Sequence, residues 1–87
     1  MTTRMNTMDK TGWQIKPIFP GRFYEAYEII NPAGRIVWYG TVEGLQIIAR
    51  DLASDLNAFS RTAPEPLLIS LRQLRERIND KLVQLAV

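Results

Sequence analysis

The apolar residues of this chain follow one pattern up to about residue 41 and another pattern after it. In the first part they alternate with polar residues or form short runs, separated by Pro-Gly and by Asn-Pro-Ala-Gly. Short segments of this kind, bounded by turn residues, are typical of β-strands. The first half therefore predicts strands at about residues 13–18, 22–30 and 35–41, joined as a short antiparallel meander.

The turn between the second and third predicted strands fixes their pairing. Residues 31–34, Asn-Pro-Ala-Gly, suit a type I turn whose last residue accepts a left-handed conformation. A three-residue loop of this kind places Asn31 opposite Arg35. With unbroken alternation, the next predicted pairs are Ile30/Ile36, Ile29/Val37, Glu28/Trp38 and Tyr27/Tyr39. Both faces of the hairpin are then mostly apolar, so we expect both to be covered at least in part.

After residue 41 the apolar residues recur every three or four positions, which is the spacing of an amphipathic helix. One helix is predicted at about residues 43–59, with an apolar stripe of Leu45, Ile48, Leu52, Leu56 and Phe59. A second is predicted at about residues 66–85, with Pro66 at its first position and a stripe of Leu67, Leu71, Leu74, Ile78 and Leu82. This helix is long for the sheet, at ~1.5 Å per residue. We expect it either to cover a sheet face or to dimerise through this stripe.

The predicted fold class is α+β, with a three-stranded antiparallel meander followed by two helices (β-β-β-α-α). The 87 residues suffice for one domain, which we assign to residues 12–87, after a flexible tail at residues 1–11. No apolar run approaches the ~20 residues of a membrane-spanning helix, and the N-terminus lacks an apolar signal segment. We therefore expect a cytoplasmic protein without a membrane partner, of an architecture common among small bacterial and phage proteins.

Histidine and cysteine are absent from the sequence. Their absence removes the usual zinc ligands and the Ser-His and Cys-His pairs of nucleophilic catalysis. Asp51 and Asp55 are four residues apart and share a helix face, but carboxylates on an ordinary solvated helix have the same spacing. The glycines match no phosphate-binding motif. We expect no catalytic residue, no metal and no cofactor, and hence a protein that is not an enzyme.

Aromatic residues concentrate in and around the predicted hairpin. Most of them, Tyr27 and Tyr39 included, are expected in the core, but Trp and Tyr are also favoured at the centres of protein interfaces. The predicted register places Trp38 opposite Glu28 with Tyr24 on the same face, and we select these three as partner-binding residues. The sequence thus predicts a non-catalytic protein–protein interaction module (an adaptor, assembly factor or inhibitor) that acts as a homo-oligomer.

Nucleic-acid binding is the alternative function. It would use basic residues of the sheet face and the C-terminal helix, namely Lys16, Arg22, Arg35, Arg72 and Arg75. The net charge is only +2, however, and Glu25 and Glu28 would lie in the middle of that sheet and repel phosphates. We therefore rank nucleic acid second, after a protein partner.

Overall fold

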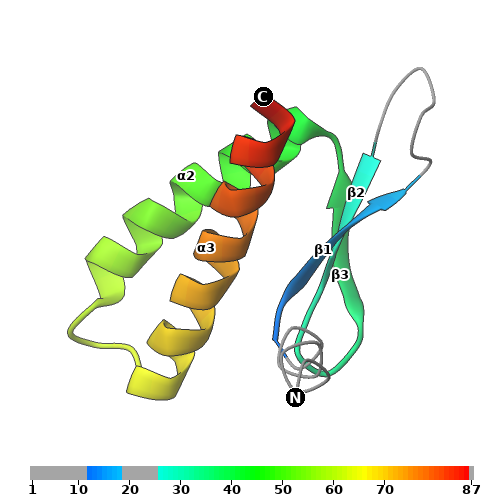
Figure 1. The fold of residues 1–87 in the computed structure, drawn as a ribbon. Helices are drawn as coiled ribbons and strands as arrows, with labels where there is room; N and C mark the ends of the chain where they lie inside the picture. Colours follow the sequence, from blue (N-terminus) through cyan, green and yellow to red (C-terminus); the bar gives the residue numbers. More distant parts are fainter. Residues whose placement is uncertain (1–11, 19–25, 87) are drawn as a thin grey trace, which may run out of the picture. The chain divides into compact units, whose positions relative to one another are not determined.

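The computed structural model describes residues 12–18 and 26–86. Its elements, in chain order, are the strands β1 (Gln14–Ile18), β2 (Ala26–Ile30) and β3 (Ile36–Gly40) and the helices α2 (Val42–Phe59) and α3 (Glu65–Ala86) (Figure 1). The strands form one antiparallel sheet in the order β1-β2-β3. This architecture confirms the predicted α+β fold class. The predicted tail at residues 1–11 and the predicted strand residues 22–25 lie outside the described residues.

The chain consists of two compact units, Met1–Val42 and Glu43–Val87. The first unit contains the sheet, and the second contains α3 and all of α2 except its first residue. Each unit is described by itself below. A single domain over residues 12–87, and the packing of a helix on a sheet face, stay predictions.

The hairpin between β2 and β3 is closed by the turn that the sequence predicts. The N–H of Gly34 donates to the carbonyl oxygen of Asn31 over 2.8 Å, and Gly34 has a φ of 87°, in the left-handed region that favours glycine. The N–H of Asn31 donates to the carbonyl oxygen of Arg35 over 2.8 Å. The side-chain Oδ1 of Asn31 accepts from the N–H of Ala33 at 3.0 Å and from that of Arg35 at 2.9 Å. Asn31 therefore holds both ends of the loop together.

Replacing Asn31 by alanine is expected to lower the free energy of unfolding by about 1 kcal/mol. The loss is modest because the two N–H groups that lose their acceptor are exposed and can bond to water instead. Urea denaturation followed by circular dichroism measures it. Asn31→Asp, which keeps an acceptor oxygen, is the matched control and should lose less than half as much. Equal losses in the two variants would mean that the Oδ1 bonds contribute nothing.

The pairing of β2 with β3 follows the prediction at its first pair and departs from it at the next. Ile30 is opposite Ile36, as predicted, but a β-bulge lies between the pairs of Ile30 and Ile29. Beyond the bulge the observed pairs are Ile29/Trp38, Glu28/Tyr39 and Tyr27/Gly40. The extra residue on β3 is Val37, and each later residue of β3 is shifted to the face opposite the predicted one. The predicted pairs Ile29/Val37, Glu28/Trp38 and Tyr27/Tyr39 are wrong for this reason.

With the bulge in place, one face of the sheet carries the buried residues Ile29 and Tyr27, and we call it the protected face. The other face carries both buried and exposed residues, and we call it the mixed face. Residues directly opposite each other share a face, so Ile29 of β2 lies between Ile15 of β1 and Trp38 of β3. On this face Ile29 is 2% exposed and Tyr27 is 3% exposed. The other face carries a row across all three strands, formed by Lys16, Glu28 and Tyr39. Lys16 and Tyr39 are exposed, so the less protected face is the one that bears this row.

Both helices form where the periodicity predicts them, and each of their ends lies within one residue of the prediction. α2 buries Leu45 and Leu52 of its predicted stripe, and Ala49 beside them. Phe59, predicted on the same stripe, is the last residue of α2 and is 54% exposed. The helix end explains this departure, because the stripe has no following turn to pack beside it.

α3 begins at Glu65 and not at Pro66. The carbonyl oxygen of Pro64 accepts from the N–H groups of Leu67 and Leu68, each over 3.1 Å, which places Pro64 at the N-cap. Pro66 fits inside the first turn because the N–H that it lacks would have no acceptor within the helix. Glu65 is favoured in this first turn because the helix dipole attracts a carboxylate there.

Candidate functional site

The candidate site lies on β3, where three of five residues have exposed apolar side chains. Ile36 is 57% exposed, Val37 is 53% exposed and Tyr39 is 74% exposed. β3 has no charged residue and lies at one edge of the sheet. Apolar side chains exposed singly are ordinary, whereas a cluster of them is typical of a surface that binds another molecule. We call Ile36, Val37 and Tyr39 the β3 edge.

The main chain of β3 also has hydrogen-bonding groups that point outward from the sheet, on the side of β3 away from β2. In an antiparallel pair, opposed residues alternate between those whose main-chain groups face each other and those whose groups face outward. The main-chain bond from Asn31 to Arg35 makes these two residues a pair whose groups face each other. The pairs Ile30/Ile36 and Glu28/Tyr39 are therefore pairs whose groups face outward. The N–H and C=O groups of Ile36 and Tyr39 therefore point away from β2. Among the described strands, none lies on that side of β3.

The opposite edge of the sheet is protected in a way that β3 is not. β1 contains an exposed lysine and an exposed proline, Lys16 and Pro17. A proline at a sheet edge has no N–H to offer, and a lysine opposes burial of the edge under another chain. β3 has neither device. The irregularity of β3 is the bulge at Val37. The two edges of the sheet therefore differ in how readily another strand could pair with them.

The predicted partner-binding patch is not assembled as expected. The bulge places Trp38 on the protected face with Ile29, whereas Glu28 shares the other face with Tyr39. Trp38 and Glu28 are both partly buried, and Tyr24 lies outside the described residues. The prediction that Glu28 and Trp38 form one patch is therefore wrong. Tyr39 occupies the place opposite Glu28 that was predicted for Trp38.

The predicted oligomer stripe on α3 is partly buried within the single chain. Leu74 is 7% exposed and Ile78 is fully buried, while Leu71 and Leu82 are intermediate. Leu67, at the start of the helix, is 48% exposed. A second copy could reach Leu67 without rearrangement, but not Leu74 or Ile78. Pairing of two copies through this stripe stays a prediction, and two of its residues, Leu74 and Ile78, are already buried in the single chain.

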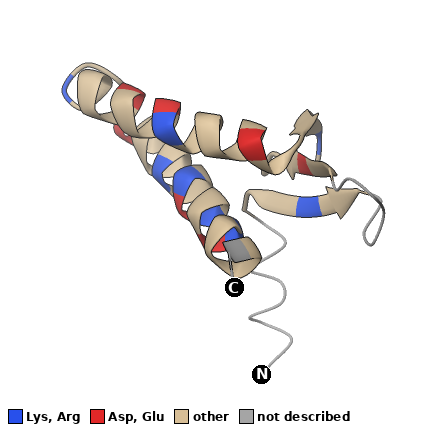
Figure 2. Cartoon of the chain, turned by 90° about the horizontal axis from the view of Figure 1, so that it is seen from above, with Lys and Arg blue, Asp and Glu red and all other residues tan. Residues whose placement is uncertain are grey.

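Two of the basic residues selected for nucleic-acid binding, Lys16 and Arg72, have an acidic neighbour. Lys16 is directly opposite Glu28. Arg72 Nη1 lies 3.5 Å from Glu65 Oε1, in a pair that is largely exposed and therefore stabilises α3 little. Arg35 is exposed in the β-turn region, Arg75 is exposed on α3, and Arg22 lies outside the described residues. Figure 2 shows basic and acidic segments interspersed along α3.

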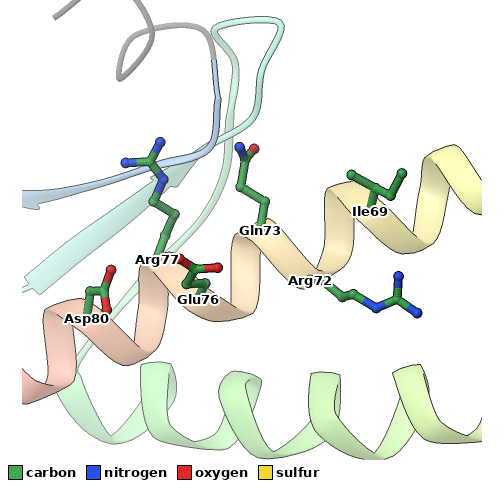
Figure 3. Close-up of a pocket in the computed structure, with 6 residues that line it drawn as sticks. All are labelled: Ile69, Arg72, Gln73, Glu76, Arg77 and Asp80. Carbon is green, nitrogen blue, oxygen red and sulfur yellow. The ribbon is translucent and has the colours of Figure 1, made fainter. Parts of the chain in front are cut away.

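A shallow hollow of about 490 Å³ lies on α3. Its described lining comes from this one helix and consists of Ile69, Arg72, Gln73, Glu76, Arg77 and Asp80 (Figure 3). These side chains leave the helix over several successive turns, and two cations are balanced by two carboxylates. Such a mixture favours neither an anionic nor a cationic ligand. We assign this hollow no function.

Two further properties concern only the described part of the chain. No group of three or more Asp, Glu, His or Cys residues there is placed to hold a metal ion. Neither described helix has the length and apolar character needed to cross a membrane.

Comparison of the chain with protein-family models, curated proteins and solved structures gave no match.

Proposed function

We propose that this protein is a non-catalytic protein–protein interaction module, working as an adaptor, assembly factor or inhibitor in the cytoplasm. The observation that carries the proposal is the β3 edge, where Ile36, Val37 and Tyr39 are all more than half exposed. Burial of these side chains under another protein would remove apolar surface from water, at ~25 cal/mol per Å² of apolar area. The absence of His and Cys from the sequence supports the non-catalytic part of the proposal.

A protein partner fits the β3 edge better than nucleic acid does. Tyr39 combines a large apolar ring with a hydroxyl, a combination favoured at the centres of protein interfaces. Phosphate binding would need a basic surface, but Glu28 is opposite Tyr39 and separates it from Lys16. The exposed row of the sheet is therefore neutral in balance and apolar at its β3 end.

Affinity capture from an extract of the source cells tests this proposal, with wild-type protein, Tyr39→Lys and Val83→Lys as baits. Val83 is the matched control because it is 65% exposed but lies on α3. We expect a protein that is retained by wild type and Val83→Lys, and retained about tenfold less or not at all by Tyr39→Lys, because a charge on a sheet edge opposes association. Identical sets of retained proteins for all three baits would contradict the proposal.

A further inference from the structure

We propose that the β3 edge binds the β3 edge of a second copy of this chain, in antiparallel orientation, to form a continuous six-stranded sheet across a two-fold axis. This inference deepens the proposed function and rests on the same exposed surface. It names one occupant for that surface, and the position of the bulge is what selects it.

The bulge sets an unusual spacing of outward main-chain groups on β3. In a regular strand, residues with outward N–H and C=O groups are two positions apart. On β3 the bulge inserts Val37, so the outward residues Ile36 and Tyr39 are three positions apart. A regular incoming strand could satisfy one of these residues but would be out of phase at the other. A matching strand needs a bulge of its own at the same place.

A second copy of β3 supplies that matching strand. When two copies lie antiparallel with Ile36 of one opposite Tyr39 of the other, both outward residues find outward partners. The same pair then occurs twice, as two-fold symmetry requires. Between these pairs, Val37 of each copy lies opposite Trp38 of the other. The bulge that prevents full pairing with a regular strand is thus matched by the same bulge in the second copy.

The side chains of β3 agree with this arrangement. Each isoleucine is placed opposite a tyrosine, and cross-strand pairs of β-branched and aromatic residues are favourable. No charged residue occurs within β3, so the paired strands bring no like charges together. Arg35, which precedes β3, falls at opposite ends of the two strands and faces Gly40 of the second copy, where no side chain opposes it.

The size of the contact predicts a weak dimer. β3 has five residues, whereas a standard protein–protein interface involves about 20–30 residues a side. We therefore expect a monomer at low micromolar concentration and a dimer that becomes the main form between about 0.1 and 1 mM.

Sedimentation equilibrium over this concentration range tests the dimer. Ile36→Lys and Tyr39→Lys should each weaken it by about tenfold or more, because each places two charges in the paired edge. Val83→Lys should leave it unchanged. Circular dichroism of each variant confirms that its fold is retained. A wild-type chain that stays monomeric at 1 mM, or a dimer that Val83→Lys disrupts and both β3 variants leave intact, would overturn the inference.

Disulfide trapping tests the register independently, because the native chain has no cysteine. In this register Ile36 of one copy and Tyr39 of the other exchange main-chain hydrogen bonds, and residues paired in this way have Cα atoms about 5.5 Å apart, within the range that a disulfide spans. A mixture of Ile36→Cys and Tyr39→Cys proteins should therefore form the mixed disulfide faster than either protein forms a disulfide with itself, since like positions are offset by about 10 Å along the strands. Equal rates of the three products would overturn the matched-bulge register.

Failure of this inference is distinguishable from failure of the proposed function. A chain that remains monomeric but captures another protein through Tyr39 overturns the self-pairing and leaves the interaction module standing. A chain that dimerises through β3 but captures no other protein overturns the adaptor role and leaves the self-pairing standing.

Discussion

Replacing Ile29 by alanine is expected to lower the free energy of unfolding by about 2–5 kcal/mol. Ile29 is 2% exposed and lies on the central strand, opposite Ile15 on one side and Trp38 on the other. Truncation removes buried methyl groups and leaves a cavity that neighbours on two strands cannot fill. Urea denaturation at low micromolar concentration, where the chain is expected to be monomeric, measures the loss.

The matched control is the same substitution one strand away, at Ile36. Because Ile36 is 57% exposed, Ile36→Ala should cost less than about 1 kcal/mol in the monomer, most of it from weaker strand propensity. The two variants remove the same atoms from residues of the same type. Equal losses would mean that the protected and mixed faces of the sheet have been assigned incorrectly.

Replacing Gly40 by alanine is expected to lower the free energy of unfolding by about 1–3 kcal/mol. A Cβ at this position would lie 2.6 Å from Cζ2 and 2.9 Å from Cη2 of Trp38. The indole lies across Gly40 because the two residues are two positions apart and share the protected face. An added methyl group would displace the indole of Trp38, and the side chains around the indole would have to move with it.

A double-mutant cycle isolates this cause. Once Trp38→Ala has removed the indole, Gly40→Ala should be close to neutral, which gives a coupling of about 1 kcal/mol or more. Gly34→Ala is the contrasting control, because no atom lies within 4 Å of its added Cβ but its φ is 87°. Its loss of about 1–2 kcal/mol should be the same with and without the indole. Additive losses for Gly40 and Trp38 would exclude the contact as the cause.

Local chemistry explains why much of the fold could be predicted from the sequence. The turn rests on residues whose preferences act within a few positions: an acceptor side chain at Asn31 and a left-handed residue at Gly34. The helices rest on a periodicity that only one secondary structure satisfies. α2 ends at Phe59 as predicted, and α3 begins one residue earlier than predicted, at Glu65, because Pro66 is tolerated in the first turn of a helix.

The bulge could not be predicted, and the candidate site changed with it. The sequence of β3 is Ile-Val-Trp-Tyr-Gly. A shift of one residue therefore replaces one apolar side chain by another on each face, and the alternation of apolar and polar residues does not favour either register. Alternation alone therefore cannot choose between the predicted register and the observed one. The one local signal was Gly40, two positions after Trp38, where a large ring needs a neighbour without a side chain.

This shift exchanged the roles of two aromatic residues. Tyr39 was expected in the core and is 74% exposed, while Trp38 was expected on the binding face and lies on the protected one. Ile36, Val37 and Tyr39, the residues that we propose to bind a partner, were not selected from the sequence, but they belong to the hairpin that the aromatic clustering had indicated. The proposed site therefore lies in the hairpin that the clustering indicated, and the register error changed which of its residues are exposed.

Hydrogen exchange of individual β3 amides, measured by NMR at about 20 μM and at about 1 mM, tests the pairing of β3 edges most directly. The N–H groups of Ile36 and Tyr39 point away from β2, whereas the opposed pair Gly40 and Tyr27 is internal to the hairpin. We predict that exchange at Ile36 and Tyr39 slows by about tenfold or more at the higher concentration while exchange at Gly40 barely changes. Concentration-independent exchange at Ile36 and Tyr39 would contradict the account.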